Sequence, residues 1–237
     1  MNDLIPISSP GVPLEFGDNG DPFIILLHDY FGRLPWLLTY AESLARIGFR
    51  VAVPDFYNGV ATVNPETAES LMGSLDVAMS LAVMNDLIRD AHEQGSHRVA
   101  SVGFSMGGWL ALLHAQGGAV DAVVAYYATL RPEEHGVIPC PVMLNLAERD
   151  EWSEGADPES FVGRLKEHGT PVTEHSYLAT VHSFANASAL SGFNADAAAF
   201  AFARSASFSK TSSPTNRSHP TGDASDRGRS TCQATRS

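Results

Sequence analysis

A G-x-S-x-G pentapeptide occupies residues 103–107, with Ser105 at its centre. In this pattern the serine lies on a sharp turn between a strand and a helix, and glycines two positions before and after it let the two elements approach closely. A buried apolar run, Val99 to Phe104, precedes the serine, and a helical pattern begins at Met106. This context predicts a nucleophile elbow, whereas the pentapeptide alone also fits an unreactive glycine-rich turn.

A nucleophilic serine needs two partners. Its hydroxyl requires an imidazole to accept its proton and a carboxylate to hold the imidazole in one tautomer. After a strand–turn–helix elbow the usual chain order is Ser, then Asp or Glu, then His. Asp150 follows the apolar run 142–146, and His182 follows the run 172–178. We therefore expect Asp150 and His182 to complete a catalytic triad with Ser105.

Other residues compete for the same roles. Glu148 and Glu151 flank Asp150, and either could be the acid if the loop is divided differently, although both also fit solvated loop charges. His175 falls inside a predicted strand. A side chain there cannot easily reach a serine on a loop, so we interpret His175 as a surface or packed histidine.

Acyl transfer also requires an oxyanion hole, in which two backbone N–H groups face the oxygen that becomes charged. We expect one donor to be the N–H of Met106, directly after the serine. The second should be the N–H of Tyr30, on the loop that follows the apolar run 23–27. His28 and Asp29 begin this loop, and an alternative interpretation is that they only terminate the strand.

These residues belong to a chain in which strand patterns alternate with helix patterns. Short apolar runs predict buried strands, and apolar residues at helical spacing predict helices. The expected strands are 23–27, 49–53, 99–104, 122–127, 142–146 and 172–178, and the expected helices are 37–47, 65–94, 106–116, 159–168 and 195–204. The alternation indicates an α/β fold with a mostly parallel sheet, helices on both faces and a site at the carboxyl ends of the strands. The connection 128–141 is too short for a sizeable cap domain.

The composition fits a globular protein with room for one large core. The chain has 237 residues, 44% of them hydrophobic, and a net charge of −12. Such an acidic surface repels phosphate backbones and anionic headgroups, so we expect neither nucleic acid nor a membrane as partner. We expect a monomer or a small homo-oligomer.

Compartment and cofactors follow from what the sequence lacks. It has two cysteines, Cys140 and Cys232, and no basic segment leading into an apolar run at its start, which predicts a cytoplasmic protein. It has no spacing typical of metal ligands and no nucleotide-binding glycine motif. We therefore expect no cofactor.

The end of the chain differs in composition. Residues 206–237 hold five basic residues against two acidic ones, are rich in Ser and Thr, and contain no Leu, Ile, Val or Met. Such a segment buries too little apolar surface to offset its ordering entropy. We expect residues 1–205 to form the α/β domain and residues 206–237 to be a disordered tail.

Four segments in order resemble the dienelactone hydrolase family of α/β-hydrolases. They are His28-Asp29-Tyr30-Phe31-Gly32, similar to E-x-F-G; Val53-Pro54-Asp55-Phe56-Tyr57, similar to P-D-L-Y; Gly103-Phe104-Ser105-Met106-Gly107-Gly108, similar to G-x-C-x-G-G; and His182-Ser183-Phe184-Ala185, similar to H-x-F. The resemblance covers residues 22–204. It implies an α/β-hydrolase fold, Ser105 as nucleophile with Asp150 and His182 as partners, and hydrolysis of an ester or lactone without a cofactor.

This chain departs from the family pattern at three positions. Ser105 stands where the namesake enzymes have cysteine, and Asp29 stands where they have glutamate. Asn186 stands at the position of the arginine that binds the substrate carboxylate, and an amide cannot make that charge-assisted bidentate contact. We therefore expect a small uncharged or weakly polar ester or lactone as the substrate rather than dienelactone itself.

Further residues fall on the loops at the same edge of the predicted sheet. The candidates for lining the site are Asp29, Phe31, Phe56, Tyr57, Trp152 and Asn186, although core packing is an equal alternative for the aromatic ones. Two other functions remain open at this point. One is a thioesterase or peptidase on the same fold, and the other is a catalytically silent binding protein.

Overall fold

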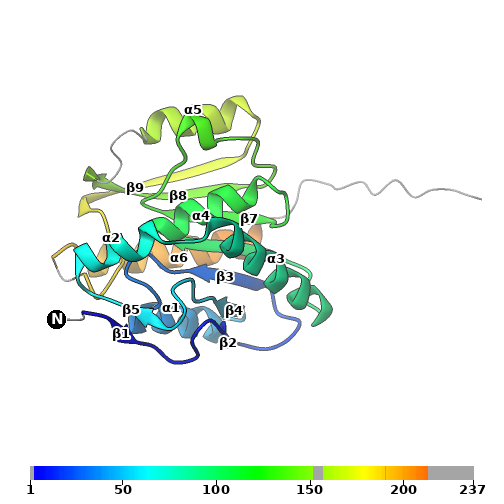
Figure 1. The fold of residues 1–237 in the computed structure, drawn as a ribbon. Helices are drawn as coiled ribbons and strands as arrows, with labels where there is room; N and C mark the ends of the chain where they lie inside the picture. The colour runs from blue at the N-terminus through cyan, green and yellow to red at the C-terminus, as the bar shows by residue number, and fades with distance from the viewer. Residues whose placement is uncertain (1–2, 152–156, 190, 213–237) are drawn as a thin grey trace, which may run out of the picture.

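A computed structural model describes residues 3–151, 157–189 and 191–212 of the chain. A seven-stranded sheet in the order β2-β4-β3-β6-β7-β8-β9 forms its centre (Figure 1). The strands of this sheet are β2 Leu14–Phe16, β3 Phe23–Leu27, β4 Arg50–Val53, β6 Val99–Phe104, β7 Ala122–Tyr126, β8 Val142–Arg149 and β9 Val172–Val181. Strand β2 pairs antiparallel with β4, and the remaining neighbours are parallel. Strands β1 Ile5–Pro6 and β5 Val60–Ala61 pair separately.

Helices cover both faces of the sheet, as predicted. Helices α1 and α6 lie behind the sheet in Figure 1, and α2, α3 and α4 lie in front of it. Their bounds are α1 Pro35–Arg46, α2 Pro65–Gly73, α3 Val77–Glu93, α4 Met106–Ala115, α5 Pro158–Glu167 and α6 Ala195–Thr211. Every residue of β3, β4, β6 and β7 is buried, which explains why their sequences are continuous apolar runs rather than alternating ones.

The prediction of one helix over residues 65–94 is wrong. Two helices, α2 and α3, meet there with a bend of 83°. The N–H of Ser74 donates to the carbonyl oxygen of Leu71 at the end of α2. The side chain of Asp76 accepts a hydrogen bond from the N–H of Met79 at 2.9 Å and caps the start of α3. An N-cap inside a continuous helical pattern thus divides it.

Two strands run further than predicted, and this matters for the site. Strand β8 continues to Arg149 and β9 continues to Val181, and these two residues are paired in register after an irregularity at Ala147. Asp150 and His182 each follow the last residue of a strand. Neighbouring parallel strands therefore carry both residues to the same edge of the sheet.

The predicted boundary at residue 206 is also wrong, because α6 continues to Thr211. Ser205, Ala206 and Ser209 are buried. The Oγ of Ser205 lies 2.8 Å from the hydroxyl of Tyr126 and 3.1 Å from Nδ2 of Asn145. Small side chains let this helix pack against β7 and β8, and Phe208 packs partly buried against the core, so the segment is held without the Leu, Ile, Val or Met whose absence suggested a tail. Residues 213–237 lie outside the described residues.

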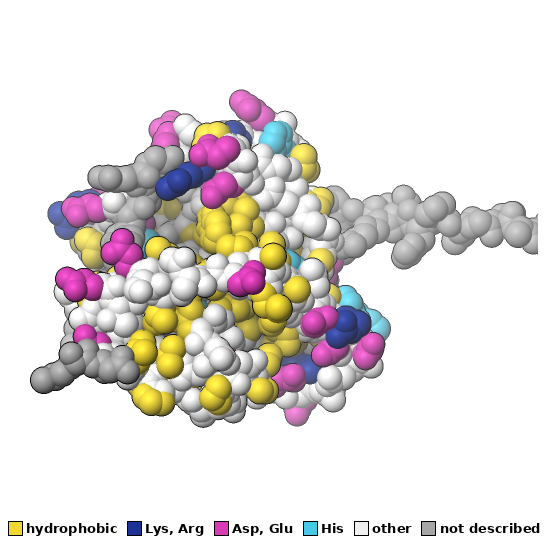
Figure 2. Space-filling model, in the orientation of Figure 1, with side chains coloured by type: hydrophobic (Ala, Val, Ile, Leu, Met, Phe, Trp, Pro, Cys, Tyr) yellow, Lys and Arg dark blue, Asp and Glu magenta, His cyan; other side chains and the backbone are white. Residues whose placement is uncertain are grey.

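The connection between β7 and β8 contains one short 3-10 helix, Pro132–Glu134, and no cap domain. On the face shown in Figure 2, Asp and Glu side chains are spread over the surface rather than gathered in one patch. Over the described residues, no single helix is long and apolar enough to cross a membrane, and the bent pair α2 and α3 meets that test together by length and composition only.

Candidate active site

Ser105 lies between β6 and α4 in a strained backbone conformation, with φ 52° and ψ −115°. A Cβ atom on Gly103 would stand 2.1 Å from the carbonyl oxygen of Gly107. A Cβ atom on Gly107 would stand 2.4 Å from the carbonyl oxygen of His28. Only glycine fits at both positions, so the backbone has the tight strand–turn–helix geometry that the sequence predicts for an elbow.

Ser105, His182 and Asp150 form a hydrogen-bonded chain. The Oγ of Ser105 is 2.8 Å from Nε2 of His182. The Nδ1 of His182 is 2.8 Å and 2.9 Å from the two carboxylate oxygens of Asp150. An ionised carboxylate can only accept a hydrogen bond, so Nδ1 of neutral His182 must carry the ring proton and donate it to Asp150. Nε2 then accepts the hydrogen bond from the serine hydroxyl. This is the arrangement that a serine needs to lose its proton on attack.

The competing residues do not join this chain. Glu148 braces the neighbouring strand instead, because its Oε2 accepts a hydrogen bond from the backbone N–H of Ala179 at 2.7 Å. Glu151 is exposed and lines a cavity beside His182. His175 lies within β9, paired in register with Asn145.

One residue at the site was missed by sequence reasoning. The ring of Tyr127 lies 4.8 Å from the imidazole of His182, measured between centroids, and 5.4 Å from the ring of Phe184. Tyr127 is the first residue after β7 and has a positive φ of 39°. Its place at the carboxyl end of a predicted strand was the available signal. It packs against the imidazole with the two rings tilted by 58°.

The two expected oxyanion donors are carried by segments in close contact. Tyr30 lies on the loop after β3, and Met106 is the first residue of α4, where backbone N–H groups have no partner within the helix. The approach of Gly107 to the carbonyl of His28 presses this loop against the first turn of α4. The hydroxyl of Tyr57 donates to Sδ of Met106 at 3.2 Å.

Two other predicted site residues, Asp29 and Asn186, form a fully buried pair. Nδ2 of Asn186 donates to Oδ2 of Asp29 at 2.6 Å, and the N–H of Phe31 donates to Oδ1 at 2.9 Å. Desolvation raises the pKa of Asp29 from 3.8 to about 6, against the opposing effects of these hydrogen bonds and of His182. The pair lies beneath the surface and links the loop after β3 to the loop after β9.

The aromatic candidates pack together around the same loop. The rings of Phe56 and Tyr57 lie 5.2 Å and 5.0 Å from the ring of His28, and the rings of Tyr30 and Phe31 lie 4.3 Å apart. Phe31 and Tyr57 are buried, and Phe56 is half-buried. Trp152 lies outside the described residues.

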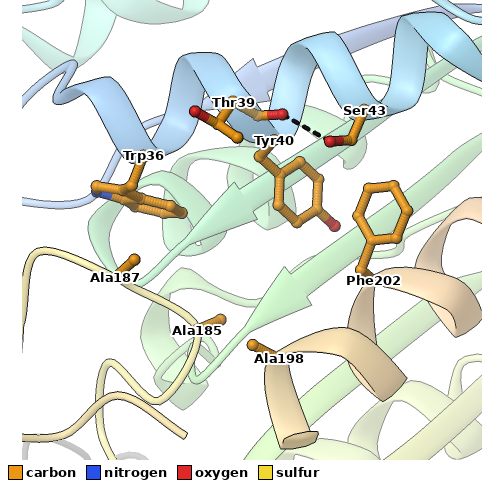
Figure 3. A pocket seen from close by; sticks show the side chains of 8 residues that line it. All are labelled: Trp36, Thr39, Tyr40, Ser43, Ala185, Ala187, Ala198 and Phe202. Carbon is orange, nitrogen blue, oxygen red and sulfur yellow. Dashed lines mark hydrogen bonds between the residues drawn. The ribbon is translucent and has the colours of Figure 1, made fainter. Parts of the chain in front are cut away.

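Two hollows border the loop that carries His182. One is a cavity of about 340 Å³ lined by Arg149, Glu151, Val181 and His182. The other is an apolar pocket of about 310 Å³ between α1 and α6, which Figure 3 shows from close by. Ala185 and Ala187, from the His182 loop, form one wall of this second pocket, and Tyr40 and Phe202 project into it from the two helices. Within the described ranges, no group of three or more His, Cys, Asp or Glu side chains is placed to hold a metal ion.

The mostly parallel sheet, the strained serine between β6 and α4, and the chain order Ser, Asp, His define the class of the protein as an α/β-hydrolase. Solved structures agree on the fold. A candidate dienelactone hydrolase from Klebsiella pneumoniae subsp. pneumoniae MGH 78578 superposes with a TM-score of 0.67 at 18% identity, covering 89% of this chain and 100% of that one.

Sequence comparison gives the family. The profile of the dienelactone hydrolase family matches residues 16–213. The carboxymethylenebutenolidase of Pseudomonas putida is 27% identical over an alignment of 202 residues that covers 79% of this chain and 84% of that protein. Protein usf of Aquifex pyrophilus is 25% identical over an alignment of 182 residues that covers 70% of this chain and 78% of that protein. The chain belongs to the dienelactone hydrolase family and is a carboxylic ester hydrolase, which confirms the resemblance found in the sequence.

Proposed function

We propose that the protein hydrolyses small carboxylic esters or lactones through an acyl-enzyme formed on Ser105. The observation that carries this proposal is the hydrogen-bonded chain from Ser105 Oγ through His182 to Asp150. The chain lies at the carboxyl ends of β6, β8 and β9, where a parallel α/β sheet places its site.

In the acylation step, Ser105 Oγ attacks the ester carbonyl carbon while Nε2 of His182 takes the hydroxyl proton. The carbonyl oxygen becomes an alkoxide, and the N–H groups of Tyr30 and Met106 are the proposed donors to it. Collapse of this intermediate breaks the bond to the alcohol, which leaves with the proton from His182. Asp150 stabilises the imidazolium that forms in between.

Deacylation repeats these steps with water. Nε2 of His182 takes a proton from the water as its oxygen attacks the acyl carbonyl, and Ser105 leaves with that proton as the carboxylic acid is released. Atoms and charge balance without a cofactor. In a lactone the leaving alcohol stays tethered to the acyl group, so the product is one hydroxy acid.

The proposed substrate is uncharged or weakly polar at the position where family members bind a carboxylate. Asn186 is matched to their arginine, and it is fully buried with its Nδ2 donating to Asp29. It therefore has neither the charge nor the exposure to bind an anion. The net charge of −12 works against anionic substrates at longer range. We place the reaction in the cytoplasm, in a monomer or small homo-oligomer.

Covalent labelling tests the proposal. A fluorophosphonate should label the wild-type protein at one site, and Ser105→Ala should abolish both the labelling and the hydrolysis of p-nitrophenyl acetate. Intact-mass spectrometry and peptide mapping locate the adduct. Persistent hydrolysis by Ser105→Ala would show that another nucleophile operates.

The same assay tests the substrate class. A neutral aryl ester should have a higher kcat/KM than an aryl ester of matched size that carries a free carboxylate on its acyl part. A preference for the carboxylate ester would contradict the proposed substrate. Parallel assays with a thioester and a peptide would show whether either is the better substrate.

A further inference from the structure

The loop after β3 carries a second buried polar group next to Asp29. His28 is fully buried, and each of its ring nitrogens faces one backbone group. Nδ1 is 2.7 Å from the carbonyl oxygen of Asp29, and the backbone N–H of Phe56 donates to Nε2 at 3.2 Å. Because Nε2 accepts, Nδ1 must carry the proton and donate to Asp29 O. Desolvation lowers the pKa of His28 from 6.5 to about 4, so the ring is neutral near pH 7.

The carbonyl that His28 holds belongs to the peptide group that carries the Tyr30 N–H. A peptide group is planar, and this one is trans, so its C=O and N–H point in opposite directions. A donor that fixes Asp29 O therefore also fixes the direction of the Tyr30 N–H, and it polarises that N–H as a donor. Gly32 N–H also donates to Asp29 O, at 3.1 Å.

The side chain of Asp29 extends this restraint in two directions. Oδ1 accepts from the N–H of Phe31, one residue beyond Tyr30, at 2.9 Å. Oδ2 accepts from Asn186, which is 157 residues away in sequence and four residues after His182, at 2.6 Å. Asn186 is itself fixed, because its Oδ1 accepts from the N–H of Ser188 at 2.7 Å. One buried carboxylate thus connects the segment around Tyr30 to the loop of the base.

We propose that His28, Asp29 and Asn186 form a positioning network. It orients the Tyr30 N–H toward the oxyanion hole and fixes the position of that N–H relative to His182. This proposal rests on the proposed function, in which Tyr30 N–H stabilises the alkoxide. None of the three side chains is assigned contact with the substrate. Each acts through a backbone group or a loop, so loss of any one should affect the transition state more than substrate binding.

A matched pair of substitutions at His28 tests the first link. His28→Asn keeps an N–H donor close to the Nδ1 position, whereas His28→Gln keeps an acceptor near Nε2 and loses the donor to Asp29 O. Removal of an oxyanion donor costs about 10²–10³-fold in kcat. Because the Gly32 bond remains, we expect His28→Gln to lower kcat for p-nitrophenyl acetate about 10–100-fold with KM nearly unchanged. His28→Asn should stay within about threefold of wild type.

A tetrahedral inhibitor gives a readout that a purely structural role would not change. A trifluoromethyl ketone forms a hemiketal on the serine, and its oxyanion occupies the same hole. Its inhibition constant should rise in His28→Gln by about the factor by which kcat/KM falls, and it should stay near the wild-type value in His28→Asn. Equal behaviour of the two variants would overturn the first link.

A charge swap tests the second link. Asp29→Asn should place two amide groups face to face, and Asn186→Asp should place two carboxylates face to face, so each single change should lower the Tm by several degrees and kcat about tenfold. The double variant Asp29→Asn/Asn186→Asp restores one donor and one acceptor, and both quantities should return close to wild type. A native Tm with kcat still depressed would show that the charge at position 29 is itself required, which would overturn the network.

The outcomes separate this proposal from the proposed function. If a fluorophosphonate labels Ser105 but His28→Gln keeps wild-type kcat and inhibitor affinity, only the network is wrong. If Ser105 is not labelled and Ser105→Ala remains active, the proposed function is wrong and the network falls with it. Should the Asp29 variants fail to fold, the two His28 variants still decide the first link, on which the positioning of the Tyr30 N–H depends.

Discussion

At the scale of single residues, two carboxylates near His182 differ sharply in their surroundings. Asp150 is about one-tenth exposed and accepts from the imidazole through both oxygens. Asp29 is fully buried and accepts from an amide and a backbone N–H. In the proposed mechanism Asp150 therefore stabilises the charge that appears on the imidazole, whereas in the proposed network Asp29 fixes the position of two backbone segments.

Substitution of Asp150 tests the identity of the acid. Asp150→Asn keeps the size of the side chain but replaces the carboxylate with a neutral amide. Its NH2 group can donate to Nδ1 and favour the wrong tautomer of His182, and it cannot stabilise the imidazolium, so kcat should fall about 10³–10⁴-fold. Glu148→Gln is the matched control, because the amide oxygen can still accept from Ala179 N, and its kcat should stay near wild type. Steady-state kinetics on p-nitrophenyl acetate measure both. A large loss in Glu148→Gln with little loss in Asp150→Asn would reverse the assignment.

The buried groups His28 and Asp29 predict opposite effects of pH on stability. His28 has a folded pKa of about 4, so as the pH falls from 6.5 to 4 the unfolded chain binds a proton that the folded chain does not, and stability falls. Asp29 has a folded pKa of about 6, so over the range from 6 to 4 the folded chain binds the proton first, and stability rises. Each effect amounts to about 3 kcal/mol, so the two nearly offset one another in the wild type.

The variant His28→Asn removes one of these two effects. We therefore expect the difference between the Tm of His28→Asn and the Tm of the wild type to shift by several degrees in favour of the variant when the pH is lowered from 7 to 4.5. Thermal unfolding followed by circular dichroism measures this difference directly. A constant difference between the two proteins across the pH range would contradict the assigned protonation of His28.

At the scale of elements, the site depends on how closely β6 and α4 pack. The turn at Ser105 brings the backbone of the strand against the first turn of the helix and against the end of β3. Contact between backbones cannot be relaxed by rotating a side chain. The two glycines of the pentapeptide are therefore required by packing, independently of any chemistry at Ser105.

A pair of glycine substitutions checks this packing. Gly103→Ala should lower the free energy of unfolding by about 3 kcal/mol or more, because the new Cβ meets backbone atoms of Gly107 and Gly108. Gly163→Ala, inside α5, meets nothing within 4 Å and should stabilise the protein by about 0.5–1 kcal/mol. Urea unfolding measures both. Comparable effects at the two positions would show that the elbow is not tightly packed.

At the scale of the whole molecule, the last helix belongs to the domain. Ser205 contacts Tyr126 and Asn145 from the central strands, and Arg98 donates to the carbonyl oxygen of Lys210. The segment 205–211 thus packs against the face of the sheet that α1 also covers, although its composition is that of a solvated tail. Composition alone misplaces the end of the domain because small polar residues can pack where the backbones approach closely.

Two truncations measure the contribution of this segment. A chain ending at Thr211 and a chain ending at Arg204 differ only by residues 205–211. The shorter chain should have the lower Tm, by about 5 °C or more, because it loses the Ser205 hydrogen bonds and the burial of Ala206 and Ser209. Equal melting temperatures would place the boundary at 206 after all.

The sequence by itself determined the fold class, the elbow and the order of the candidate residues. Each of these follows from local information, such as a buried apolar run, a glycine pattern, or a polar residue at the end of a strand. Because the carboxyl ends of parallel strands lie at one edge of the sheet, local signals were also enough to predict that Ser105, Asp150 and His182 lie at the same edge. They could not give the division of helix 65–94 at Asp76, since that cap interrupts an otherwise continuous periodicity.

Only the tertiary structure decided which groups meet inside the protein. The bond between Asp29 and Asn186 joins residues 157 positions apart, and nothing in either local sequence specifies it. The same is true of the support that Tyr127 gives to His182 and of the burial of Ser205. Such contacts depend on how strands and helices pack in three dimensions. A local sequence pattern does not specify which side chains from distant segments come into contact.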